Sequence, residues 1–212
     1  MTSDPARPVR RASLEEVRRG EFVVAALQVI ARQGYDRTTV RDIAQAAGVS
    51  VGSVHYYFKT KDDLLYAAFE ESEARTREAL DALLASASSA RERLDRLVEL
   101  CFPIDDADDS QWVVEIDVWQ QAARHTSFQE LFARGNRDWV ERIEEMLRQG
   151  VDSGEFTIDD RSAEARSIAA LIDGLGIYAR VTQHVSVAEA RALLSRHFDR
   201  LQRRPAAAPA AR

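Results

Sequence analysis

The chain of 212 residues has almost no cysteine and no long hydrophobic run. Its single cysteine, Cys101, excludes an intrachain disulfide bond and a cluster of thiolate metal ligands. No apolar run reaches the roughly 18 residues that a membrane-spanning helix needs. The arginines near the N-terminus are not followed by an apolar stretch, so this segment does not resemble a signal peptide. We therefore expect a cytoplasmic protein with no membrane partner.

The sequence also lacks the short motifs that accompany common enzyme active sites. It contains no G-x-S-x-G, H-E-x-x-H, P-loop or G-x-G-x-x-G pattern. The four histidines lie far apart along the chain, at His55, His125, His184 and His197. We expect no enzyme, no metal site and no cofactor. Because residues that are distant in sequence can meet in a fold, an enzyme is retained as the weaker alternative.

The net charge of −6 argues at first against a nucleic-acid partner. The charge is unevenly distributed, however: basic residues outnumber acidic ones in residues 1–60, and acidic residues dominate the rest. A basic N-terminal part on an acidic body is expected when only one end of a protein meets phosphate. The charge pattern alone is a weak indication of DNA binding.

Proline is scarce within the chain, and no strand-type alternation is sustained, so we expect an all-α protein. Three capping boxes mark predicted helix starts, pairing Ser13 with Glu16, Thr39 with Asp42 and Thr60 with Asp63. Gly34 and Gly48 suit the left-handed position that ends a helix. About nine helices are predicted, near residues 13–33, 39–47, 50–58, 61–85, 90–101, 110–124, 127–152, 160–183 and 187–203.

We expect four segments along the chain. They are a flexible basic tail (1–12), a three-helix helix-turn-helix domain (13–60), a larger helical ligand-binding and dimerisation domain (61–203), and a disordered Ala/Pro-rich tail (204–212).

Residues 39–58 are the most informative stretch. Two short helices are separated by a four-residue turn at Gly48, the spacing of a helix-turn-helix. Val49 is expected to plug the turn into the core, with Val54 and Phe58 facing inward. The second helix then leaves serine, histidine and tyrosine side chains on its outer surface. Hydroxyl, imidazole and aromatic groups on one exposed helix are typical of a major-groove reader.

The block from Phe22 to Leu65 resembles the DNA-binding domain of the TetR family of transcriptional regulators. The resemblance rests on the patterns Thr-x-Arg-x-Ile-Ala from Thr39, Ala-Gly-Val-Ser from Ala47, and Tyr-Tyr-Phe-Lys-x-Lys from Tyr56. It implies that the DNA contacts are made by Thr39, Arg41, Ser50, Val51, Ser53, His55, Tyr56, Lys59 and Lys61. Most members have tyrosine where His55 stands, so whether His55 contacts a base or a phosphate stays open. Most members are repressors, which implies repression relieved by a ligand.

The remainder of the chain resembles the family's helical body, and loosely the BetI-like branch. In TetR-like proteins the last two helices pair with those of a second copy, so the helices near 160–183 and 187–203 are assigned to a homodimer interface. Two copies would present two recognition helices to a palindromic operator on double-stranded DNA. The alternative is that these helices only close the core of one subunit.

Candidate ligand residues lie between the DNA-binding part and the predicted interface. Trp112, Glu115 and Trp119 share a helix face, and an acid among aromatic rings suits a cationic group of a small-molecule effector. The alternative is that Glu115 pairs with a neighbouring arginine. Asp117 and Asp173 are weaker candidates of the same kind. The full predicted set is Cys101, Phe102, Trp112, Glu115, Trp119, Asp173 and Tyr178, although such aromatic residues are often plain core.

Two further functions remain open on the sequence. The helix-turn-helix could bind a protein instead of DNA, but an exposed row of His55 and Tyr56 beside two lysines argues against it. The chain could also bind DNA without any ligand.

Overall fold

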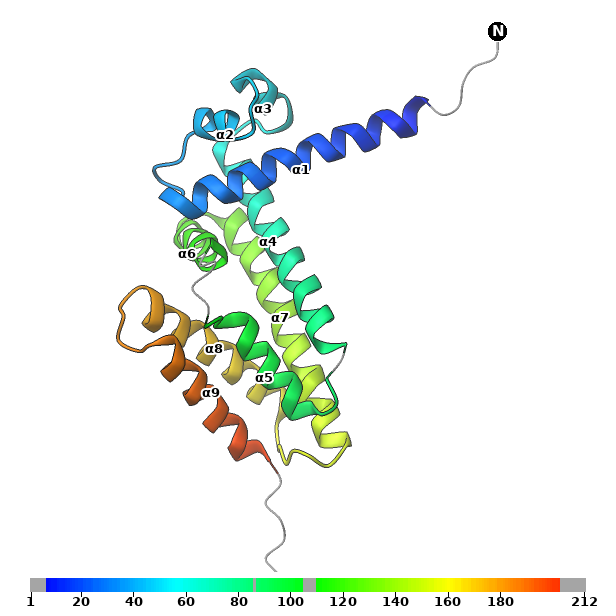
Figure 1. The fold of residues 1–212 in the computed structure, drawn as a ribbon, viewed down its shortest axis with the longest axis vertical. Helices are drawn as coiled ribbons and strands as arrows, with labels where there is room; N and C mark the ends of the chain where they lie inside the picture. The colour runs from blue at the N-terminus through cyan, green and yellow to red at the C-terminus, as the bar shows by residue number, and fades with distance from the viewer. Residues whose placement is uncertain (1–6, 86, 105–109, 203–212) are drawn as a thin grey trace, which may run out of the picture. The chain divides into compact units, whose positions relative to one another are not determined.

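The computed structural model describes residues 7–85, 87–104 and 110–202. Within these ranges the chain forms nine α-helices and one isolated β-bridge between Phe156 and Gln202 (Figure 1). The helices are α1 (Arg7–Gln33), α2 (Val40–Ala46), α3 (Val51–Tyr57), α4 (Lys61–Leu84), α5 (Ala90–Cys101), α6 (Ser110–Ala122), α7 (Thr126–Asp152), α8 (Arg161–Arg180) and α9 (Val187–Leu201).

The sequence prediction was wrong about the start of the first helix. Helix α1 begins at Arg7, so it runs through Ser13, and the segment predicted as a flexible tail is helical from Arg7 onward. Pro8 is compatible with this start, because the N–H groups of the first helical turn have no partner within the helix. The predicted disorder of residues 204–212 lies outside the described residues.

The chain divides into two compact units. The head unit comprises Met1–Thr76 and Asp108–Ala133, and the body unit comprises Arg77–Ala107 and Arg134–Arg212. Helix α6 therefore belongs to the head unit, although the sequence placed it with the body. The reason is that Val114 and Val118 of α6 are fully buried in the same hydrophobic cluster as α1 to α4.

Local sequence explains the helices of the head unit. Thr39 begins α2 with the predicted capping box, since its side chain accepts from the Asp42 amide and its own amide donates to the Asp42 carboxylate. Thr60 and Asp63 make the same reciprocal pair at the start of α4. Gly34, at φ +76°, follows the end of α1 in the left-handed conformation that glycine adopts without strain.

In the body unit, α5, α8 and α9 pack against one another. The amide groups of Ala90 and Arg91, at the start of α5, both donate to the carboxylate of Glu155 at 3.1 Å. This carboxylate caps α5 from the segment after α7. Gly150 of α7 allows a very close approach: a Cβ atom there would lie 2.1 Å from Cδ2 of Phe156.

Candidate DNA-binding surface and effector residues

Helices α2 and α3 form a helix-turn-helix whose turn is fixed by local chemistry. Gly48 adopts φ +66°, the left-handed conformation that the turn requires. Ser50 caps α3 by accepting from the amide of Ser53 at 3.2 Å. Ile43 of α2 and Val54 of α3 are fully buried, so their packing sets the angle between the two helices.

The outer face of α3 carries the predicted groove-reading side chains. Tyr56 is 66% exposed, and His55 and Val51 are also exposed, while Ser53 is half-buried. Arg41 of α2 is exposed on the same motif. The motif therefore exposes aromatic, imidazole and guanidinium groups, which are groups that suit contact with a major groove.

Two side chains of this motif, Val49 and Tyr57, lie differently from expectation. Val49 does not plug the turn into the core, because 37% of its surface is exposed, whereas Ile43 and Ala44 of α2 are buried. Tyr57 packs inward: its ring meets that of Phe22 edge to face at 5.3 Å. Tyr57 in turn supports Tyr56, whose ring lies 5.0 Å away, and this contact restricts the orientation of the exposed tyrosine.

The two lysines predicted to contact DNA, Lys59 and Lys61, make internal contacts. Nζ of Lys59 donates to the carbonyl oxygens of His55 at 3.1 Å and Tyr56 at 3.4 Å, at the C-terminal end of α3. Nζ of Lys61 donates to the carbonyl oxygen of Tyr35 at 2.8 Å and lies 3.9 Å from the centre of the Tyr35 ring. Lys59 is exposed, whereas Lys61 is half-buried, so Lys59 is the more readily available to DNA.

Sequence reasoning missed a polar cluster around Tyr35 in the head unit. The Tyr35 hydroxyl donates to the Asp62 carboxylate, and the Tyr35 amide donates to Oδ2 of Asp117 at 2.8 Å. Burial, and then the Asp62 carboxylate, raise the pKa of the Tyr35 hydroxyl, so this group stays a donor. Burial also raises the pKa of the Asp117 carboxyl. No local sequence signal links Tyr35 to Asp117, because the two residues are 82 positions apart.

The candidate ligand residues of α6 lie in the head unit. Trp112 is buried, and Glu115 and Trp119 are half-buried. The Trp119 ring meets the Phe132 ring edge to face at 5.7 Å. The Nε1 atom of Trp119 is buried and has no hydrogen-bond partner among the described residues. A buried indole N–H without an acceptor costs free energy, which an acceptor atom of a bound molecule would recover.

The other candidates lie in the body unit, on α5 and α8 or directly after them. Phe102 is fully buried, and the guanidinium of Arg180 lies 5.6 Å from the centre of its ring. Cys101 is half-buried, and Tyr178 is 55% exposed. Asp173 is half-buried, and burial raises the pKa of its carboxyl to about 6. This carboxyl has no hydrogen bond or ion pair within the described part of the body unit.

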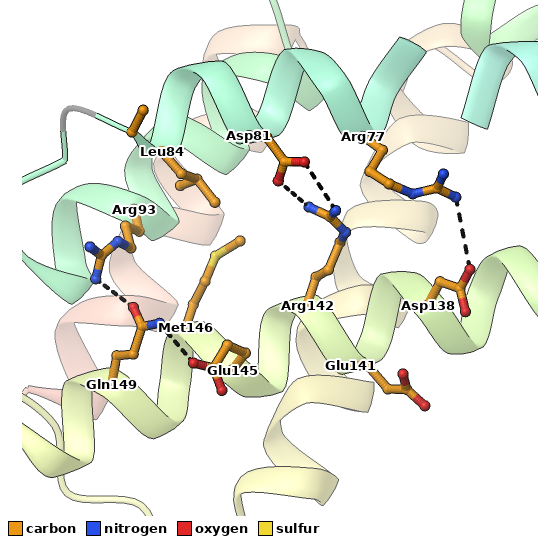
Figure 2. A pocket seen from close by; sticks show the side chains of 11 residues that line it. Arg77, Asp81, Leu84, Arg93, Asp138, Glu141, Arg142, Glu145, Met146 and Gln149 are labelled. Carbon is orange, nitrogen blue, oxygen red and sulfur yellow. Dashed lines mark hydrogen bonds and ion pairs between the residues drawn. The ribbon is translucent and has the colours of Figure 1, made fainter. Parts of the chain in front are cut away.

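A cleft with a volume of about 640 Å³ opens in the body unit between α4, α5 and α7 (Figure 2). None of the predicted ligand residues lines it. Charged groups face one another across it: Arg142 of α7 contacts both carboxylate oxygens of Asp81 on α4, at 2.7 and 3.3 Å. Arg77 of α4 lies 3.8 Å from Asp138 of α7. These two pairs join α4 to α7 across the cleft.

Together, the capped α2, the Gly48 turn and the exposed face of α3 define a DNA-binding helix-turn-helix protein. The family model for the TetR family of bacterial regulatory proteins matches residues 22–68, and the model for the C-terminal domain of BetI-type transcriptional repressors matches residues 90–203. The chain therefore belongs to the TetR family and has a BetI-type C-terminal domain. It is a transcriptional repressor and not an enzyme.

Known proteins resemble the chain over most of its length. The transcriptional regulator BetI of Rhizobium meliloti is 30% identical over 167 residues, which are 79% of this chain and 80% of that protein. The repressor KstR2 of Mycobacterium tuberculosis is 32% identical over 149 residues, 67% of this chain and 70% of that protein. The crystal structure of a transcriptional regulator from Saccharomonospora viridis in complex with choline is 31% identical and has a TM-score of 0.82. That match covers 90% of this chain and 100% of the other.

No described helix combines the length and the apolar character that crossing a membrane requires.

Proposed function

We propose that this repressor binds a palindromic operator as a homodimer and is released from it by a small organic cation of the choline class. The observation that carries the ligand half of this proposal is the half-buried carboxyl of Asp173, which has no partner among the described residues. The similar regulator from Saccharomonospora viridis, which was crystallised with choline, supports the same class of ligand.

The DNA contacts are proposed for the face around α3. The exposed side chains of His55 and Tyr56 contact base edges or phosphates, and the N-terminus of α3 at Ser50 directs backbone N–H groups toward the DNA backbone. Arg41 and Thr39 contact the DNA from α2, although the Thr39 hydroxyl is already engaged in its capping box. The remaining proposed contacts are Val51, Ser53, Lys59 and Lys61.

The dimer is proposed to form through α8 and α9. Three large apolar side chains on these helices, or next to them, are exposed to solvent in the single chain. Tyr178 is 55% exposed, Val181 is 57% exposed and Leu193 is 37% exposed. Two copies joined here would present two α3 helices to successive major grooves, which lie about 34–36 Å apart. Mass measurement in solution tests the assignment. Leu193→Glu should yield monomers and lose operator binding, while Ala123→Glu, at an exposed position of the head unit, should remain dimeric.

The cation site is proposed at Asp173. Withdrawing a carboxyl from water disfavours its charged form, which is why its pKa is raised. A bound quaternary ammonium group would favour the charged form of Asp173 by pairing with the carboxylate. The α6 face with Trp112, Glu115 and Trp119, in the head unit, is a separate candidate site, because aromatic rings attract cations and the Trp119 N–H is placed to donate to a ligand oxygen.

A titration of operator binding with choline chloride tests the ligand proposal. Choline should weaken the binding of a labelled duplex, whereas its neutral isostere 3,3-dimethylbutan-1-ol should not, because only a positive charge pairs with a carboxylate. Asp173→Asn should abolish the response if Asp173 holds the cation. Trp119→Phe, which keeps the ring and removes the N–H, should weaken the response if α6, and not Asp173, holds the ligand. A wild-type protein whose operator affinity does not respond to choline would refute the ligand class.

A further inference from the structure

In the head unit, a hydrogen bond joins α6 to the turn that follows α1. The carboxylate of Asp117, on α6, accepts from the backbone amide of Tyr35 at 2.8 Å. Tyr35 follows Gly34, whose φ of +76° turns the chain away from α1 toward α2. The Tyr35 amide thus lies just after the end of a helix, and Asp117 provides its hydrogen-bond acceptor from another part of the chain.

Tyr35 is also the point where two other elements meet. Its side chain is 5% exposed, and its hydroxyl donates to Asp62 in the first turn of α4. Its carbonyl oxygen accepts from Nζ of Lys61 at 2.8 Å, and the same ammonium group lies over its ring. One residue therefore joins α6, the start of α4 and the turn between α1 and α2.

The α1–α2 turn determines where the DNA-binding helices begin. Four residues separate Tyr35 from the helical start of α2 at Val40, and the buried Thr38 within that segment bonds back to the carbonyl oxygen of Gly34 at 2.8 Å. A shift of Tyr35 is therefore transmitted over a short, hydrogen-bonded segment to α2, and through the α2–α3 packing to the recognition face. Base contacts require placement to within a few tenths of an ångström, so small shifts of this turn cost affinity.

We propose that Asp117 is a positioning residue for operator binding: its carboxylate, presented by α6, holds the Tyr35 amide and so fixes the orientation of α2 and α3. Asp117 contacts no DNA in this account. Two charged groups lie near the Asp117 carboxyl. The Asp36 carboxylate disfavours its charged form, and the Lys61 ammonium favours it.

The test compares variants of Asp117 on a duplex that the wild-type protein has selected from a randomised library. Asp117→Ala removes the acceptor and should weaken operator binding about tenfold, the effect of losing one hydrogen bond to a charged group. Asp117→Asn keeps an oxygen acceptor at the same position and should stay within about threefold of wild type. Gln120→Ala, at an exposed position on the same helix, is the matched control and should bind as wild type does.

Circular dichroism and thermal unfolding, measured on the same samples, separate positioning from folding. The proposal requires that Asp117→Ala stays helical at the assay temperature while its operator affinity falls. The proposal is overturned if Asp117→Ala binds the operator as tightly as wild type. It is also overturned if Asp117→Asn loses as much operator affinity as Asp117→Ala. If Asp117→Ala unfolds, Asp117→Leu, which keeps the branched shape of the side chain without an acceptor, decides by the same criteria. Unfolding of both variants would show a purely structural role and overturn the proposal. Failure of the wild-type protein to select any duplex would instead contradict the proposed operator binding.

Discussion

Replacing Asp173 by asparagine should stabilise the protein at neutral pH. Its carboxyl has a pKa of about 6 in the folded chain against an ordinary value of 3.8, a difference of roughly two pH units caused by burial. Each pH unit corresponds to about 1.4 kcal/mol, so the charged carboxylate lowers the free energy of unfolding by up to about 3 kcal/mol at pH 7.5. Asparagine has no charge to desolvate and removes most of this cost.

The sign of the pH dependence follows from the same two values. Between pH 6 and 4 the folded protein binds a proton at Asp173 that the unfolded chain does not bind, so this group makes the wild type more stable as the pH falls. The advantage of Asp173→Asn should therefore shrink to about half at pH 5. A bound cation favours the carboxylate, so choline affinity of the wild type should also fall as the pH drops below about 6.

Urea unfolding at pH 7.5 and pH 5, at one protein concentration, measures both effects. Asp159→Asn, which makes the same change at an exposed residue, is the control and should leave stability nearly unchanged. An Asp173→Asn variant that is no more stable than wild type at pH 7.5 would refute the reasoning. So would an advantage that is equally large at both pH values.

Two further predictions concern packing and helix capping. Gly150→Ala should destabilise the body unit by about 1–3 kcal/mol in urea unfolding, because the added Cβ would lie 2.1 Å from Cδ2 of Phe156. The control is Gly20→Ala, whose added Cβ would meet no atom of another element within 4 Å, and this change should be neutral or slightly stabilising. Equal effects of the two changes would contradict this. Hydrogen bonds from Ser88 lower the pKa of the Glu92 carboxyl from 4.5 to about 2. The charged Glu92 carboxylate therefore stabilises the folded protein above about pH 4.5, and this stabilisation is lost as the pH falls toward 2. Ser88→Ala should raise the pKa of Glu92 in an NMR titration, and an unchanged value would refute the assignment.

Much of the fold could be predicted because helix boundaries depend on neighbouring residues. The capping boxes at Thr39 and Thr60 and the left-handed glycines at Gly34 and Gly48 all act over four residues or fewer, and each lies where the sequence placed it. The recognition face was predictable for a similar reason. Once Val54 and Phe58 are assigned inward, helical periodicity leaves His55 and Tyr56 outside.

The features that sequence reasoning missed depend on contacts between distant segments. Nothing near Asp117 indicates that its carboxylate meets the Tyr35 amide, and its helix looked like part of the body because it follows α5 along the chain. The exposure of Val49 depends on how the turn packs against the rest of the head unit, which its position after Gly48 does not determine. Likewise, the pairing of Asp81 with Arg142 across the cleft requires the three-dimensional arrangement of α4 and α7.

The most direct test of the account is the affinity of the His55→Ala, Tyr56→Ala double variant for a duplex selected by the wild-type protein. The wild type should bind this duplex with an affinity that falls steeply as salt rises, and the double variant should lose about 100-fold or more in affinity while its helical circular dichroism is unchanged. A double variant that binds the selected duplex as tightly as wild type would contradict the claim that the exposed face of α3 reads the operator.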